Sequence, residues 1–511
     1  MARREGAPYL IFYDGEGRRS AWSYRDFAAD ALRTAALLRQ RGVGEGGRVA
    51  ILSKNRPEVL LSYFACWLMG ACACPVNVEE SGERKAFIVR RSRCEVALAE
   101  VAWLSELDAL SVRAVPIENV LEEARRLEPL EPIDAPPDQG AFLVYTSGTT
   151  GNPKGVLLSH QNLLANAQAT ADWHALGAGD GVMTVLPMHH VNGAVVTGLT
   201  SFLAGGRNIL NRGFSPRTFW QRLAAERAAV ASVVPTLLEF LLAADEDISG
   251  YDLSQLRYLL CGAGPLLSET VVRFEDRFGV PVCHGFGMSE TTAYNTQFPM
   301  DLSNEARRRL YKEYGFPSVG CALACNEVAV LRSDGSKADP LEPGEIAVRG
   351  SSVMAGYLNN PEANARAFQH SWFRSGDQGF YDVDASGREF FFLSGRMKEL
   401  IIRGGVNLSP LEIDEALRDC PGVAFALAFP FENSYYGEEV ALYVVPEKGA
   451  ALREEEVLSY AETKLPFAKR PKVVLFGEEI PYTTTGKPKR LELAQRLAED
   501  LKSYRATQFR E

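Results

Sequence analysis

Short apolar runs typical of buried strands alternate with amphipathic helical patterns along the first four hundred residues. Between residues 23 and 42 apolar side chains recur at helical spacing, and the strand-like run 48–52 follows. Ser215 and Pro216 are residue types preferred at a helix start, and the run 230–234 follows as another strand. Helices and strands alternating at this spacing predict βαβ units in doubly wound, largely parallel sheets. Ligands of such folds usually bind beyond the carboxyl ends of the strands.

The pattern changes beyond about residue 330. Segments 344–350 and 388–396 are short strands separated by Gly, Asp and Ser turns, which is typical of a barrel or meander. The last hundred residues form a charged module, with a helix expected at 410–418 and strands at 424–429 and 440–445. The sequence therefore predicts an α/β fold of doubly wound βαβ sheets plus a small β-barrel, followed by a small α+β module.

Length and composition limit the class of protein. A chain of 511 residues indicates two or more domains, and a net charge of −10 argues against a general nucleic-acid binder. Nine scattered cysteines indicate reduced thiols and a cytoplasmic location. The apolar segment 59–78 approaches membrane-spanning length, but Gly70, Pro75 and Asn77 interrupt it. We therefore expect a buried helix and strand there, and no stable membrane insertion.

A loop rich in glycine and hydroxyl residues, YTSGTTGNPKG at 145–155, continues the apolar run 141–145. Glycine lets the backbone come close to a ligand, and hydroxyl and backbone N–H groups donate to phosphate oxygens. The loop lacks the Gly-Lys-Ser/Thr ending of a Walker A motif. A flexible surface turn is the alternative, but a turn does not need so many of these residues. The loop therefore favours phosphate binding.

Seven blocks of the chain, in the same order, resemble those of the adenylate-forming superfamily of acyl-CoA synthetases, peptide-synthetase adenylation domains and luciferases. The resemblance is greatest to acyl-CoA synthetases. The blocks are YTSGTTGNPKG (145–155), LPMHHVNG (186–193), HGFGMSETT (284–292), GEIAVRGSSVMAGYLNNPE (344–362), WFRSGDQG (372–379), SGRMKELIIRGGVNLSPLEI (394–413) and PYTTTGKPKR (481–490).

This resemblance implies a reaction in two halves that uses ATP, Mg²⁺ and CoA. A carboxylate attacks the α-phosphate of ATP to give an acyl-adenylate and pyrophosphate, and the CoA thiol then displaces AMP to give a thioester. Because two anions must approach each other, the site has to supply cations and hydrogen-bond donors. The resemblance also implies an adenylation domain at 1–397 and a small mobile α+β domain, carrying the catalytic lysine, at 398–511.

For the phosphates of ATP, the resemblance implies a set of loop residues and two residues beyond them. Ser289 is expected to contact phosphate, and Glu290 to hold Mg²⁺, a hard cation that prefers carboxylate oxygen. The loop set is Thr146, Ser147, Gly148, Thr149, Thr150, Gly151 and Lys154.

For the nucleoside, Phe286 is expected against one face of adenine and the backbone of 262–264 against the other. Asp377 is expected to bind the ribose hydroxyls, and Arg396 a neighbouring ribose or phosphate oxygen. The remaining residues implied to contact the nucleotide are Gly262, Ala263, Gly264, His284, Gly285, Gly287 and Met288.

The resemblance further implies that the C-terminal domain rotates at Lys398 between the two half-reactions. Lys487 would bridge the substrate carboxylate and the α-phosphate, and the hairpin 400–407 would then replace it. Gly404 and Gly405 would let the pantetheine arm of CoA pass beside the backbone. A solvated lysine in a basic tail is the alternative for Lys487, and the other blocks outweigh it.

Three histidines lie in or next to the blocks, and each is expected to have a different role. His190 matches the family residue that gates the acyl pocket and is counted as catalytic. His189 is expected to be structural, because neighbouring side chains on a strand point to opposite sides. His284, expected at the floor of the acyl pocket, indicates either an unusual substrate or a satisfied core histidine. The basic segment 301–314 is expected to be a solvated helix, with a cover over the pocket entrance as the alternative.

Three functions are compatible with these features. The first is an acyl-CoA synthetase acting on a mostly apolar acid, fatty, aromatic or polycyclic. The second is a ligase that loads an acyl carrier protein, and the third is a binding homologue without catalysis, which intact Glu290, Asp377 and Lys487 disfavour. Amino-acid activation is disfavoured because 186–193 contains no acidic residue to pair with an ammonium group. We expect a monomer or homodimer.

We predict that Lys487→Ala selectively impairs adenylation. A preorganised donor that stabilises developing charge contributes on the order of 10²- to 10³-fold to rate, so pyrophosphate release should fall by that factor. Thioester formation from supplied acyl-adenylate and CoA should largely survive. The two half-reactions are measured separately, and an equal loss in both would contradict the role assigned to Lys487.

Overall fold

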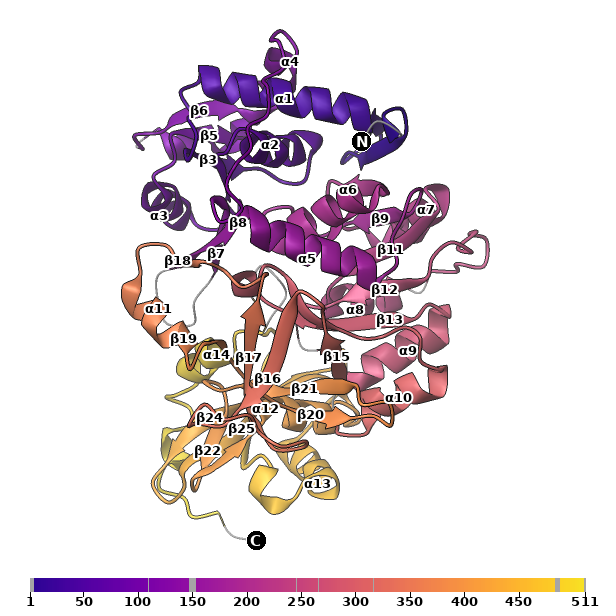
Figure 1. Cartoon of the computed structure of the whole chain (residues 1–511). Coiled ribbons are helices and arrows are strands. Elements are labelled where there is room, and N and C mark those ends of the chain that lie inside the picture. The colour runs from indigo at the N-terminus through magenta and orange to yellow at the C-terminus, as the bar shows by residue number, and fades with distance from the viewer. Residues whose placement is uncertain are drawn as a thin grey trace.

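The computed structural model describes residues 4–108, 110–146, 153–244, 246–264, 266–315, 317–482 and 488–509. Three β-sheets organise this part of the chain, and in Figure 1 the seven-stranded sheet and the C-terminal sheet lie toward opposite ends of the molecule. No helix among the described residues is long and apolar enough to cross a bilayer.

The seven-stranded sheet is doubly wound. Val49 and Ile51 belong to one hydrophobic core, whereas Ala50 and Leu52 belong to another, so both faces of the sheet are covered. β3 to β7 pair in parallel, and β8 returns antiparallel to β7. The order is β18-β8-β7-β4-β3-β5-β6, with β3 (Arg48–Leu52), β4 (Cys72–Pro75), β5 (Val96–Ala99), β6 (Arg113–Pro116), β7 (Gly140–Thr146), β8 (Lys154–Ser159) and β18 (Gly356–Tyr357).

The fourteen-stranded sheet begins as a second parallel sheet and continues as antiparallel strands. Its parallel strands share the core of Val49 and Ile51. These are β1 (Pro8–Tyr13), β9 (Gly181–Thr184), β10 (Arg207–Asn211), β11 (Ala228–Val233), β12 (Tyr258–Cys261) and β13 (Val282–Gly287), with β2 (Arg19–Ser23) antiparallel at the edge.

The antiparallel strands enclose a small core of their own, which includes Val319, Val348 and Phe391. This is the region for which the sequence predicts a small barrel. The strands are β14 (Tyr294–Gln297), β15 (Ser318–Ala322), β16 (Asn326–Leu331), β17 (Gly344–Gly350), β19 (Phe368–Gln369), β20 (Trp372–Val383) and β21 (Glu389–Arg396).

Helices cover these sheets. The predicted first helix is α1, whose N-cap Ser23 accepts a hydrogen bond from the Asp26 backbone N–H. The segment 59–78 is confirmed as a buried helix and strand, α2 and β4. The helices up to residue 400 are α1 (Tyr24–Gln40), α2 (Pro57–Leu68), α3 (Gly82–Ser92), η2 (Val101–Leu107), α4 (Ile117–Ala124), α5 (His160–Trp173), the π-helix η3 (Asn192–Leu199), α6 (Thr200–Ala204), α7 (Pro216–Ala225), α8 (Pro235–Ala244), α9 (Ser268–Phe278), η4 (Ser289–Thr291), α10 (Asn304–Lys312) and α11 (Pro361–Ala367).

The expectation of a solvated helix at 301–314 was only partly right. One face of α10 is buried: Arg307 pairs with Glu275 at 3.0 Å, and the Tyr311 hydroxyl donates to the Val282 carbonyl at 2.6 Å. The sequence suggested solvation because of its basic residues, but the buried Arg307 is paired with a carboxylate. The helix is therefore an anchored part of the fold.

The C-terminal part packs around its own sheet. Leu427 and Phe429 on β24 belong to one core and Ala426 and Ala428 to another, and both cores consist of residues from Ile401 onward. The fold-class prediction is confirmed, while the boundary at 397/398 stays a prediction. The elements are β22 (Ile401–Arg403), β23 (Val406–Leu408), α12 (Pro410–Leu417), β24 (Val423–Asn433), β25 (Gly437–Pro446), α13 (Glu454–Lys464), η5 (Phe467–Lys469), β26 (Val473–Phe476), α14 (Arg490–Arg496) and η6 (Lys502–Tyr504).

Polar contacts join α12 to the helices before it. The backbone N–H of Ser268, the first residue of α9, donates to Glu415 Oε1 at 3.0 Å, and Arg418 pairs with Glu239. A carboxylate at a helix N-terminus is favourable, because the helix dipole is positive there. Burial nevertheless raises the pKa of Glu415 to about 7. This contact therefore depends on pH.

We predict that α12 docks on α9 less tightly as the pH rises from about 4.5 to about 7. The docked state holds the Glu415 proton more tightly than an exposed glutamate with a pKa of 4.5 does. Its contribution is therefore fully present below pH 4.5 and is lost as the pH rises through 7. Energy transfer between fluorophores on the two parts, titrated from pH 4.5 to 8, measures the change.

Glu415→Gln should remove most of this pH dependence. A smaller part of the pH dependence should come from Glu269 on α9, because a hydrogen bond with Asp419 raises the pKa of Glu269 as well. This part should disappear when Asp419→Asn is added. Glu412→Gln is the matched control, since Glu412 lies on the same helix and pairs with Lys469 instead. A wild-type pH profile in the Glu415→Gln variant would refute the assignment.

Candidate active site

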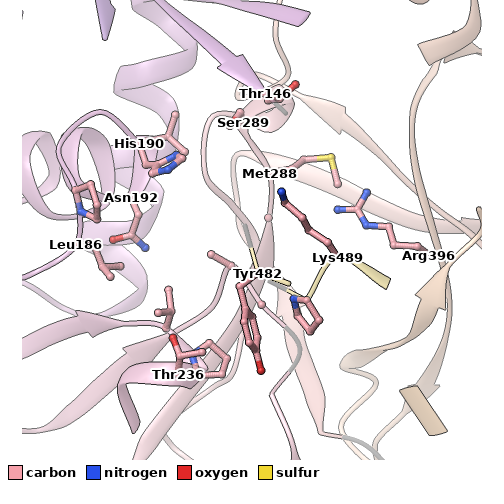
Figure 2. Close-up of a pocket in the computed structure, with 18 of the residues that line it drawn as sticks. Thr146, Leu186, His190, Asn192, Thr236, Met288, Ser289, Arg396, Tyr482 and Lys489 are labelled. Atoms are coloured by element: carbon pink, nitrogen blue, oxygen red, sulfur yellow. The ribbon is translucent and has the colours of Figure 1, made fainter. Parts of the chain in front are cut away.

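A cavity of about 2160 Å³ opens where the sheets and the C-terminal part meet. Its lining includes Thr146, the last residue of β7, and Lys154, the first residue of β8, which pair with each other across the strands. Arg396 lines it from β21, and Tyr482 and Lys489 line it from the C-terminal part. Figure 2 shows side chains from all of these segments turned toward one space. Elements distant in sequence therefore share one cavity.

Lys154, Tyr357 and Glu290 form a charged cluster in the cavity wall. The Tyr357 hydroxyl donates to Glu290 Oε1 at 2.9 Å, and Lys154 Nζ lies 4.8 Å from the centre of the Tyr357 ring. Burial, followed by the charge of Lys398, lowers the pKa of Lys154, and Glu290 opposes this shift. Burial and the charge of Glu290 raise the pKa of Tyr357, so the phenol stays a donor.

The backbone of Tyr357 is held on both sides. Tyr357 pairs with Val156 across β18 and β8, and its N–H donates to Asn364 Oδ1 at 2.7 Å. The Asn364 amide in turn donates to the Tyr357 carbonyl at 3.1 Å. These contacts fix the phenol that orients Glu290.

Glu290 has the chemistry of a Mg²⁺ ligand. One of its carboxylate oxygens accepts from Tyr357, and an ionised carboxylate has capacity for further contacts. Hard divalent cations prefer such oxygens, and Mg²⁺ is usually held by one or two carboxylates together with substrate phosphates. The residues present therefore fit Mg²⁺, and Glu290 is the residue that would hold it. When bound, the cation would neutralise charge on the phosphates and orient them.

Asp377 and Arg396 pair across β20 and β21, with Arg396 Nε 2.8 Å from Asp377 Oδ1. The charge of Asp377 is the main cause of the raised pKa of Arg396. Arg396 reaches the cavity together with Lys398, whereas the Asp377 side chain is 7% exposed and lies outside the lining. Arg396 is therefore the member of the pair that faces the cavity.

The strand β13 presents its residues alternately. Gly287, followed by Met288, lines the cavity, as do Ala263 and Gly264 from the segment after β12. Phe286 points the other way and packs in the core around Val319 and Phe391. Among the residues expected at the nucleotide, Gly262, His284, Gly285 and Phe286 are absent from the described lining.

His284 is buried, and its Nδ1 lies 3.0 Å from the Ser318 carbonyl oxygen. Burial lowers its pKa to about 4, so the ring is neutral at pH 7. Of the two alternatives left open for this residue, the structure therefore supports the satisfied core histidine.

His189 and His190 lie in a turn between β9 and η3, and both line the cavity. The expectation that they point to opposite sides was wrong, because it assumed a strand. Their ring centres are 4.5 Å apart. Burial, and then the neighbouring His190, lower the pKa of His189, so a neutral ring sits beside His190.

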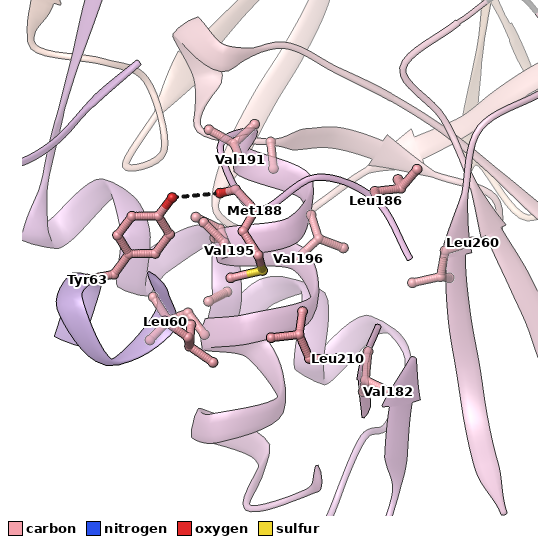
Figure 3. Close-up of a cluster of buried hydrophobic side chains, with 14 of the residues drawn as sticks. Leu60, Tyr63, Val182, Leu186, Met188, Val191, Val195, Val196, Leu210 and Leu260 are labelled. Carbon is pink, nitrogen blue, oxygen red and sulfur yellow. Dashed lines mark hydrogen bonds between the residues drawn. The ribbon is translucent and has the colours of Figure 1, made fainter. Parts of the chain in front are cut away.

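This turn is anchored to the core beneath it. The Tyr63 hydroxyl donates to the Met188 carbonyl at 2.9 Å, and Asn55 Oδ1 accepts from the Met188 N–H at 2.7 Å. Figure 3 shows Tyr63 reaching Met188 above a cluster that includes Val195 and Val196 of η3. The histidines therefore sit on a rigid base.

Some expected residues cannot be placed. Ser147, Gly148, Thr149, Thr150, Gly151 and Lys487 lie outside the described residues. Tyr482 and Pro488, which flank the latter gap, pair with each other and line the cavity. Gly404 and Gly405 turn the β22–β23 hairpin with φ of 56° and 84°, which favours glycine, and they are absent from the described lining.

Sequence reasoning missed Tyr357, although it lies within one of the seven blocks. Its partner Glu290 is 67 residues away, so no local spacing indicates the contact. It also missed Asn192 and Tyr294, which line the cavity. Gly262 and Gly285 were the only sequence feature that could have indicated Tyr294, because the absence of their side chains leaves room for its ring.

Comparisons with known proteins agree with this geometry. Residues 1–358 match the AMP-binding enzyme family, and residues 412–487 match the AMP-binding enzyme C-terminal domain. Sulfoacetate–CoA ligase of Cupriavidus necator is 34% identical over 95% of this chain and 94% of the relative. Indoleacetate–CoA ligase of Aromatoleum aromaticum is 31% identical over 93% of each chain. ATP-bound MatB from Rhodopseudomonas palustris superposes with a TM-score of 0.86 at 27% identity, covering 97% of each chain.

We predict that Tyr357→Phe raises the Mg²⁺ concentration needed for half-maximal pyrophosphate release by about tenfold. Loss of a group that orients a metal ligand typically lowers metal affinity 10- to 100-fold. Tyr381→Phe is the matched control, because its hydroxyl donates to the Ala338 carbonyl in the antiparallel region, away from Glu290. An unchanged Mg²⁺ requirement in Tyr357→Phe would exclude this role.

Proposed function

Because the chain belongs to the AMP-binding enzyme family, we propose that it activates a carboxylic acid with ATP and then forms a thioester with CoA. The predicted resemblance to the adenylate-forming superfamily is confirmed by the family match and by a CoA ligase at 34% identity. ATP, Mg²⁺ and CoA, the cofactors that the resemblance implied, are those of such ligases.

The observation that carries the proposal is the Lys154–Tyr357–Glu290 cluster, which shares one cavity with the histidine pair and the C-terminal part. Lys154, Arg396 and Lys398 bring positive charge to the place where two anions must meet. Glu290 supplies the oxygen for the metal. A purely structural cluster would not need this set of charges at a cavity.

In the first half-reaction a substrate carboxylate oxygen bonds to the α-phosphorus, and the bond from that phosphorus to the pyrophosphate oxygen breaks. Lys154, together with Lys487, would stabilise the negative charge that develops on the phosphates. In the second half-reaction the CoA sulfur bonds to the acyl carbon, AMP leaves with the acyl–oxygen electron pair, and the thiol proton goes to solvent.

We propose that the substrate acid is mostly apolar apart from its carboxylate. Apolar side chains line the same cavity as His190, among them Val191, Val196, Val234 and Leu237. The names of the relatives do not decide the substrate, since one acts on sulfoacetate and another on indoleacetate. Loading of a carrier protein in place of CoA is the alternative. Cytoplasmic location and a monomeric or homodimeric state stay predictions.

A panel of carboxylic acids assayed for pyrophosphate release, with and without CoA, tests the proposal. We expect acid-dependent release and an acyl-CoA product when CoA is present. Pyrophosphate release without a thioester would favour the carrier-protein alternative. No pyrophosphate from any acid, in the presence of ATP and Mg²⁺, would refute the proposed function.

A further inference from the structure

We propose that Tyr294 closes the inner end of the acid-binding pocket and restricts the enzyme to compact acids with a neutral hydrogen-bonding group at the far end. This inference rests on the proposed function. It adds a specificity-determining residue, and it limits the apolar body of the acid to a few carbons that end in a neutral polar group.

Tyr294 lies across the carboxyl ends of the parallel strands. It opens β14, where it pairs with Gly287, and its carbonyl accepts a hydrogen bond from Asn166 of α5 at 2.8 Å. The side chain lines the cavity and is 4% exposed. The ring is therefore held between the sheet and the helices that face it.

Two glycines make room for this ring. A Cβ added to Gly262 would lie 2.8 Å from Tyr294 Cε1 and 2.9 Å from its hydroxyl, and a Cβ added to Gly285 would lie 2.8 Å from the ring. Real Cβ atoms essentially never approach other atoms so closely. The space that side chains on β13 and after β12 would fill is occupied by the ring, which thereby blocks the inner end of the pocket.

The end of the pocket is polar. Ser232 Oγ donates to Asn192 Oδ1 at 2.8 Å. The Tyr294 hydroxyl is buried and makes no hydrogen bond of standard geometry in the described chain. Burial raises the pKa of Tyr294, and Ser232 and Asn192 oppose this shift, so the three side chains face one another. A buried hydroxyl without a partner is unfavourable, and a ligand acceptor would satisfy it.

The distance from His190 to the polar end of the pocket is short. His190 and Asn192 are two residues apart, so their Cα atoms are separated by at most about 7 Å. An acid whose carboxylate lies near His190 therefore meets the Tyr294–Asn192–Ser232 cluster after only a few carbons. A long acyl chain could not extend past this cluster.

The cluster suits a neutral group and not a second anion. No cation hydrogen-bonds to it within the described residues, and the lining residue Arg212 is already paired with Glu100 at 2.7 Å. A second carboxylate at this end would be a buried charge without a counter-ion, which is strongly unfavourable. A hydroxyl or carbonyl group on the substrate matches the phenol and amide donors.

The test compares kcat/KM for pyrophosphate release with propanoate, 3-hydroxypropanoate, malonate and octanoate. We expect the wild-type enzyme to prefer 3-hydroxypropanoate to propanoate about tenfold or more, because a site built to hydrogen-bond a hydroxyl discriminates against an analogue without it. Tyr294→Phe should bring this ratio close to one, and Tyr294→Ala should move the preference toward octanoate. Tyr258→Phe, whose hydroxyl contacts buried His174 away from the cavity, is the matched control.

The outcomes are distinct. An active wild-type enzyme that prefers octanoate or malonate overturns the inference and leaves the proposed function standing. Absence of release with every acid overturns the proposed function instead. If Tyr294→Ala does not fold, as thermal unfolding would reveal, Tyr294→Phe still decides, because it keeps the ring. An unchanged ratio in Tyr294→Phe overturns the polar role.

Discussion

The pairing of β18 with β8 is the contact on which the candidate site depends. It brings Tyr357, from the antiparallel region, onto the edge of the sheet that carries Lys154. Because the Tyr357 hydroxyl then reaches Glu290 near the end of β13, one side chain connects three segments distant in sequence. This short pairing therefore helps to fix the positions of the carboxylate and the lysine relative to each other.

The contacts between the two parts of the chain are of a different kind. Glu415, Arg418 and Ser268 meet through charged and polar groups that water can replace. The buried Arg490, by contrast, is satisfied inside the C-terminal part by Asp414 at 2.6 Å. Interfaces of this polar type are typical of domains that move relative to each other. The C-terminal part therefore has its own core and polar contacts with the rest of the chain, while its mobility stays a prediction.

How far the sequence could predict this protein depends on the range of the signal. Helical periodicity is local, so α1 followed directly from the spacing of its apolar residues. The position of His189 depended on a turn where the sequence suggested a strand. The position of Phe286 depended on which face of β13 its side chain occupies, which the sequence does not specify. The contact between Tyr357 and Glu290 had no local signal, because it depends on strand pairing.

Most of the residues proposed to select the acid lie outside the sequence motifs, and His190 and Asn192 are the exceptions. The resemblance assigns most of the seven blocks to the reaction steps that the family shares, so they identify the family and leave the acid undefined. Val234 and Leu237 fall between the blocks, and Tyr294 lies just after one. Tyr294 acts through its shape, because its ring fits only when residues 262 and 285 are glycine. Two relatives that each share about a third of their residues with this chain therefore carry names with sulfoacetate and indoleacetate, two acids of different size and charge. The acid that this chain accepts has to be inferred from the depth and polarity of its own pocket.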